Sequence, residues 1–166
     1  MVVMDEAIRP PRFALLLTGG AVTIAALALS LVPSAGLLAF AGGLIAVVGT
    51  ARGSQRVLGL GALLQFAAVV VAGAASLSPG LLLVGILGAV LGWDIGEQSI
   101  NVTRQLGSDA TMVRSIVIHG AGSTFVGAVA MVLVYGTFLV STGGQPLVAL
   151  VAFLGGGGLV LLAMRA

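Results

Sequence analysis

The stretch from Arg12 to Phe40 reads RFALLLTGGAVTIAALALSLVPSAGLLAF, and it contains two apolar runs joined by a short segment with one proline. The first run is long enough to cross a bilayer, because a spanning helix needs about 20 apolar residues at about 1.5 Å rise per residue. Both runs are continuous and lack the alternation of polar and apolar positions that is typical of a membrane β-barrel. The stretch therefore predicts a helical hairpin in a membrane.

The composition of the whole chain agrees with this prediction. Of 166 residues, 59% are hydrophobic and only 7% are charged, which leaves too few polar groups to cover a water-soluble globule. The chain has no cysteine, which excludes disulfides and thiolate metal sites. Its net charge of +2 gives no indication of a nucleic-acid partner. We expect a multi-pass protein of the cell membrane.

Clusters of proline, glycine and arginine divide the chain into six apolar segments. We predict an all-α fold, a polytopic membrane helix bundle of six transmembrane helices arranged as three helical hairpins. One transmembrane domain covers residues 13–166 and follows a cytoplasmic tail of residues 1–12. The predicted spans are Phe13–Val32, Ala35–Ala51, Val57–Leu77, Pro79–Gln105, Asp109–Val140 and Leu147–Met164.

The seven basic residues, all of them arginine, predict the orientation of the bundle. Cytoplasmic loops collect Arg and Lys, whereas short translocated loops do not. The three connections predicted on the opposite side of the membrane carry no charge of either sign. Six spans with both termini in the cytoplasm place every arginine on one side, and five or seven spans would not. The arginines are Arg9, Arg12, Arg52, Arg56, Arg104, Arg114 and Arg165.

The fourth predicted helix carries two acids near its end, in the stretch LGWDIGEQSINVTRQ from Leu91 to Gln105. At about 100° per residue, its polar side chains share one face of the helix. Asp94 lies about 22 Å along the helix from Pro79, inside a hydrocarbon layer of about 30 Å. An aspartate at the centre of a membrane helix costs about 2.5 to 3.5 kcal/mol to insert, and less near the interface. Asp94 therefore requires a partner. The candidate cluster comprises Asp94, Glu97, Asn101, Arg104, Arg114 and His119.

Three interpretations of this cluster are open. In the first, the carboxylates of Asp94 and Glu97 pair with Arg114 and His119 and form a structural clasp between two helices. In the second, the cluster is a path for protons or cations, for which intramembrane Asp, Glu and His are the usual groups. The third is a metal site or a catalytic carboxylate. A single histidine without cysteine disfavours a metal, and no phosphate loop, HExxH motif or serine nucleophile elbow occurs.

Glycine spacing predicts how the fourth helix packs. The chain has 26 glycines, and Gly88, Gly92 and Gly96 recur every fourth residue. In lipid, small residues allow helix backbones to approach closely, which supplies packing contact. This ridge is nearly opposite the polar face, so we expect it to contact another helix. Glycine-rich helix faces also favour a homo-oligomer or a complex with other membrane subunits.

The region of residues 93–127 resembles a family of uncharacterised multi-span membrane proteins from halophilic archaea. The resemblance implies an integral protein of the cell membrane, encoded near MoxR-type ATPases and transglutaminase-like proteins, with no known activity. Arg104 and Ile116 stand where acidic residues are typical of that family, so a mechanism that needs more acids than the Asp94 and Glu97 pair is disfavoured. The matching positions are Trp93, Asp94, Gly96, Glu97, Leu106, Gly107, Ala110, Arg114, His119 and Gly127.

Taken together, these patterns predict a non-enzymatic structural or assembly subunit of a membrane complex. We expect no cofactor and no metal. The expected partners are the lipid bilayer and either further copies of the chain or other membrane subunits. The alternative is a small proton- or ion-coupled transporter or channel that uses Asp94, Glu97 and His119.

Overall fold

A computed structural model of the protein describes residues 10–106 and 110–140, and every element in these ranges is an α-helix. The helices are α1 (Arg12–Leu29), α2 (Pro33–Ala51), α3 (Gln55–Ala74), α4 (Pro79–Leu106) and α5 (Ala110–Val140). All five are long and apolar enough to cross a membrane, which confirms the prediction of apolar membrane helices for the described ranges. The sixth predicted span, Leu147–Met164, and residues 1–9 of the predicted tail lie outside these ranges.

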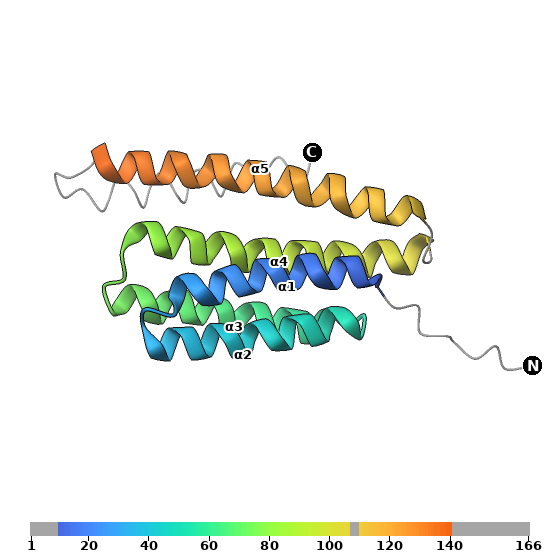
Figure 1. Ribbon diagram of the computed structural model, residues 1–166, viewed down its shortest axis with the longest axis horizontal. Coiled ribbons are helices and arrows are strands. Elements are labelled where there is room, and N and C mark those ends of the chain that lie inside the picture. Colours follow the sequence, from blue (N-terminus) through green and yellow to red (C-terminus); the bar gives the residue numbers. More distant parts are fainter. Residues whose placement is uncertain (1–9, 107–109, 141–166) are drawn as a thin grey trace, which may run out of the picture. The chain divides into compact units, whose positions relative to one another are not determined.

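Helices α1 to α4 form an antiparallel bundle in which each helix lies beside the next one and α4 lies beside α1 (Figure 1). The turn between α2 and α3 and the C-terminal end of α4 are therefore at the same end of the bundle as the start of α1 (Figure 1). Arg12, Arg52, Arg56 and Arg104 all lie at that end. The chain divides into two units after Val132, and the geometry below concerns the part that precedes this point.

The α2–α3 turn is built by a glycine and a serine. Gly53 has a φ of 63°, a left-handed conformation that glycine adopts without a Cβ penalty. The N–H groups of Gly53 and Ser54 donate to the carbonyls of Thr50 and Gly49, at 3.0 and 2.9 Å, and so complete a Schellman motif. The Ser54 hydroxyl then accepts from the N–H of Val57 and caps α3. These caps start α3 at Gln55, two residues before the predicted Val57.

Two helices end three residues earlier than predicted, each for a local reason. α1 ends at Leu29 instead of Val32, because the residue before a proline avoids the helical region and Val32 is extended before Pro33. Pro33 then occupies the first turn of α2, where a missing N–H costs nothing. α3 ends at Ala74 instead of Leu77, because Ser76 adopts a left-handed φ of 61°.

The core of the bundle combines many alanines with a few larger apolar side chains such as Leu29 and Leu58. One buried cluster takes Val22, Ala46, Leu58 and Ile100 from the four helices in turn. Helices α2 and α3 lie very close at Gly61, where an added Cβ would lie 2.6 Å from the Gly42 carbonyl oxygen. Such a distance is too short for real side-chain atoms, so alanine and glycine set the spacing of these helices.

Candidate functional site

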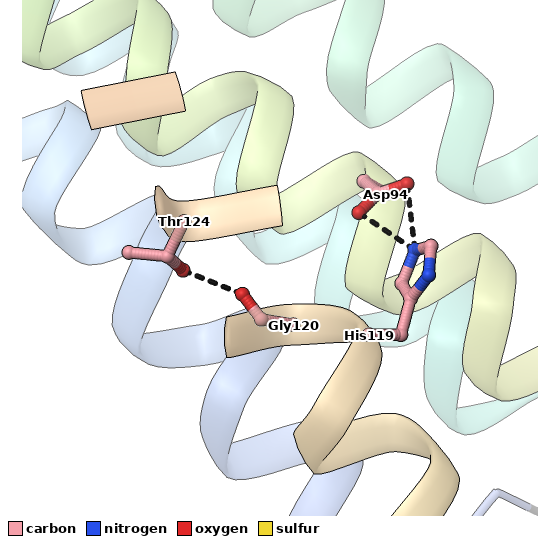
Figure 2. Close-up of polar contacts among 4 residues, drawn as sticks. All are labelled: Asp94, His119, Gly120 and Thr124. Atoms are coloured by element: carbon pink, nitrogen blue, oxygen red, sulfur yellow. Dashed lines mark hydrogen bonds and ion pairs between the residues drawn. The ribbon is translucent and has the colours of Figure 1, made fainter. Parts of the chain in front are cut away.

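The central feature of the site is a contact between Asp94 of α4 and His119 of α5. The Nε2 atom of His119 lies 3.0 Å from Oδ2 and 3.2 Å from Oδ1 of Asp94, so one ring nitrogen contacts both carboxylate oxygens (Figure 2). The side chain of His119 is 39% exposed, and that of Asp94 is 31% exposed. The intramembrane acid that the sequence singled out is thus paired with the single histidine of the chain.

Small and apolar residues surround this pair and bring α5 close to α4. Ile116, which is 1% exposed, joins a buried cluster with Ile95 of α4 and Ala14 of α1. A Cβ added to Gly120 would lie 3.6 Å from Ile95, an ordinary contact distance. The Gly120 carbonyl also accepts from the hydroxyl of Thr124 at 2.7 Å, within the same helix (Figure 2). His119 is therefore held on the face of α5 that packs on α4.

A second polar network connects the end of α4 to the α2–α3 turn. The amide of Gln55 donates to Oδ1 of Asn101 at 2.7 Å. Arg104 donates to the Gly53 carbonyl at 2.9 Å and to Oε1 of Gln55 at 3.4 Å. Asn101 and Arg104 are thus turned away from Asp94, although all three were predicted to form one cluster. Gln55 and Gly53 were missed, because the arginine pattern places the α2–α3 turn at the same end as the end of α4 but does not indicate which side chains meet there.

The two remaining members of the predicted cluster, Glu97 and Arg114, are not brought together. Glu97 is half-buried and Arg114 is exposed, and neither forms an ion pair within residues 10–106 and 110–140. Arg114 instead lines an open pocket of about 490 Å³ between α4 and α5. The other lining residues are Gln98, Ser115, Ile118 and His119.

The three ridge glycines of α4 face other helices of the bundle. A Cβ on Gly88 would lie 2.7 Å from the Ala21 carbonyl oxygen, and one on Gly92 would lie 2.5 Å from Val22. A Cβ on Gly96 would lie 2.8 Å from the hydroxyl oxygen of Thr50 in α2. Their role in assembly stays a prediction, and these distances show where it can be tested.

The chemistry available at the site is that of a paired carboxylate and imidazole. Within the described part of the chain, no three His, Cys, Asp or Glu side chains gather as metal ligands would. The Asp94 and His119 pair can hold a proton between an oxygen and a nitrogen, or it can hold two helices together. Both uses depend on the same two side chains.

Comparison with known proteins identifies a family but no activity. The model of a family of unknown function (DUF7519) matches residues 8–162. No curated protein and no solved structure matches the chain. The family match agrees with the expectation of an uncharacterised family, and it gives no information about the archaeal source or the pattern in residues 93–127. Because the match covers nearly the whole sequence, this chain belongs to the DUF7519 family of unknown function.

Proposed function

We propose that this protein is a non-enzymatic structural or assembly subunit of a membrane complex, in which the Asp94–His119 contact fixes α5 on the bundle. The observation that carries the proposal is the position of the contact. Both oxygens of Asp94 are directed at a residue of the next helix, not at a residue of α4 itself. Separating α5 from α4 would leave a carboxylate unpaired in an apolar layer, which is costly. The contact therefore favours one fixed placement of α5.

A fixed α5 presents a broad apolar face to its surroundings. Large side chains such as Phe125, Val126 and Val129 are 71%, 66% and 43% exposed. In a membrane, these side chains contact lipid, further copies of this chain or other subunits. We infer that both termini and the arginine-bearing end of the bundle are cytoplasmic, since cytoplasmic loops collect arginine. The predicted sixth span, Leu147–Met164, would return the chain to that side of the cell membrane.

The orientation can be tested with single cysteines, because the natural chain has none. Ser78 and Gln105 are exposed and lie at opposite ends of α4. In intact cells, a membrane-impermeant maleimide should label S78C and leave Q105C unlabelled until the cells are opened. Labelling of Q105C in intact cells would reverse the inferred orientation.

The structural role can be tested by replacing Asp94 and His119 with their uncharged counterparts. D94N and H119Q should each lower the thermal stability of the purified protein in mild detergent, and the double variant should lose little more than either single variant. E97Q is a matched control, because Glu97 lies one turn away on α4 and forms no ion pair with a described residue. Unchanged stability of D94N and H119Q would contradict the structural role.

The alternative is a small proton- or ion-coupled transporter or channel that uses Asp94, Glu97 and His119. One observation favours it. His119 lines the open pocket between α4 and α5, so protons can reach the Asp94–His119 pair from the surroundings of the protein. In proteoliposomes, a transporter would show pH-dependent flux that disappears in D94N and E97Q while both variants remain folded. The proposed structural role predicts no such flux.

A further inference from the structure

The pocket between α4 and α5 contains side-chain hydrogen-bond donors that have no partner among the described residues. Arg114, Gln98 and Ser115 line it, and their side chains form no hydrogen bond or ion pair with another described residue. Among the described residues, no carboxylate lines the pocket. The nearby carboxylate of Asp94 is directed at Nε2 of His119. The pocket is therefore a group of unoccupied donors with one permanent positive charge, an arrangement that suits an anion.

The depth of the pocket indicates which anions it meets. From Pro79, at the uncharged end of α4, Gln98 lies about 28 Å along the helix axis, and the hydrocarbon layer is about 30 Å thick. His119 is level with Asp94 because the two are in contact. On the antiparallel α5, Arg114 precedes His119 by five residues, which places it about 7 Å nearer the charged end. Gln98 and Arg114 thus lie at the boundary between hydrocarbon and headgroups, where lipid phosphates lie.

We propose that this pocket binds the phosphate group of an anionic phospholipid, with Arg114 as the charged ligand and Gln98 and Ser115 as further donors. A planar guanidinium offers two parallel N–H groups to two phosphate oxygens. Ile118, which is 61% exposed, lies on the same wall and contacts the first part of the lipid tail. Basic pockets between transmembrane helices on the cytoplasmic side commonly hold such headgroups. This proposal goes beyond the structural role of the Asp94–His119 contact, and it does not depend on that role.

The test is a titration of the full-length protein in detergent with phosphatidylglycerol. Native mass spectrometry measures the amount of bound lipid. R114Q should weaken phosphatidylglycerol binding about tenfold or more, because it removes a charge-assisted contact. R52Q is the matched control: Arg52 is exposed at the same end of the bundle and does not line the pocket, so its removal should leave binding unchanged. S115A should weaken binding to a smaller extent. R114K keeps the charge and should bind more tightly than R114Q.

A second arm separates a lipid from a free anion. Inorganic phosphate is offered by equilibrium dialysis, and phosphatidylcholine, a zwitterionic lipid, is offered under the same conditions as phosphatidylglycerol. Binding of phosphatidylglycerol that depends on Arg114 supports the proposal. Binding of inorganic phosphate alone, in an Arg114-dependent manner, would keep the phosphate site but overturn its assignment to a lipid.

Two results would overturn the phosphate site itself. One is equal loss of binding in R52Q and R114Q, which would reveal a general effect of surface charge. The other is binding by R114Q that equals that of the natural protein. The D94N variant retains Arg114, so its stability tests the proposed structural role separately from the lipid site. If D94N and H119Q leave stability unchanged while R114Q loses lipid, the structural role fails and the lipid site stands.

Discussion

The four-helix bundle and α5 are held in different ways. In α1 to α4, 33–39% of the residues in an 18-residue apolar stretch are buried, whereas the buried residues of α5 between Val113 and Val132 are Ile116 and Gly120. The bundle is held by many close contacts between small residues such as Ala46 and Gly61. Helix α5 is anchored near its start by Ile116 and by the polar contact between His119 and Asp94. Helices of similar mean hydropathy can therefore be held by packing or by a few specific groups.

This difference has a physical origin in the membrane. Lipid tails are as apolar as leucine, so burying a large apolar side chain between helices gains little hydrophobic free energy. Close packing and polar contacts remain as the forces that hold helices together. The bundle relies mainly on close packing, whereas α5 relies on the buried Ile116 and on the contact between His119 and Asp94. Variants that weaken one of the two should therefore affect one region more than the other.

The largest effect is expected in the bundle, at Gly61. A Cβ in G61A would lie 2.6 Å from the Gly42 carbonyl oxygen and would also collide with the backbone of Ala46. Because α2 and α3 must then separate, we expect a loss of about 3 kcal/mol in the free energy of unfolding. The measurement is a denaturant titration in detergent micelles, followed by circular dichroism. G59A on the same helix is the control, since a Cβ at Gly59 meets nothing within 4 Å. Equal stability of the two variants would argue against close packing of α2 on α3.

An intermediate effect is expected at the anchor of α5. Ile116 is 1% exposed, and I116A removes its contacts with Ile95 and Ala14. Since lipid lowers the hydrophobic part of the loss, we expect about 1 to 2 kcal/mol. Protease sensitivity of α5 should rise in I116A, while the bundle remains resistant. Ile118 is 61% exposed, and I118A should leave both properties unchanged. Simultaneous loss of the bundle in I116A would show that α5 and the bundle unfold together.

The smallest effect is expected for two buried threonines of the bundle. The hydroxyl of Thr50 donates to the Ala46 carbonyl at 3.0 Å, whereas the buried hydroxyl of Thr18 has no hydrogen-bond partner among the described residues. T50V should cost about 0.5 to 1.5 kcal/mol, and T18V should be neutral or slightly stabilising, because it removes a buried polar group without a partner. Thermal unfolding of the two variants side by side makes this comparison. A larger loss in T18V would indicate that its hydroxyl is satisfied in the membrane.

Local structure could largely be read from the sequence. Pro79 begins α4 as predicted and Gly53 ends α2, because their backbone preferences act over a few residues. Helix α2 begins at Pro33, two residues before the predicted Ala35, because proline fits the first turn of a helix. The end of α3 could not be predicted, since serine seldom adopts the left-handed conformation of Ser76. Helix ends of this kind depend on hydrogen bonds to preceding carbonyls, which the residue type alone does not reveal.

For the candidate site, the sequence by itself determined that Asp94 lies in an apolar helix and must have a partner, because the cost of an unpaired carboxylate there is a property of the residue and its depth. Only the tertiary structure decided which partner it takes. His119 contacts Asp94, Arg104 is directed to Gly53, and Arg114 lines a pocket instead of joining an ion pair. Periodicity places residues on a face of their own helix, but the rotation of each helix about its axis is set by how neighbouring helices pack. That rotation decided which of the polar side chains at similar depth in the membrane contact each other.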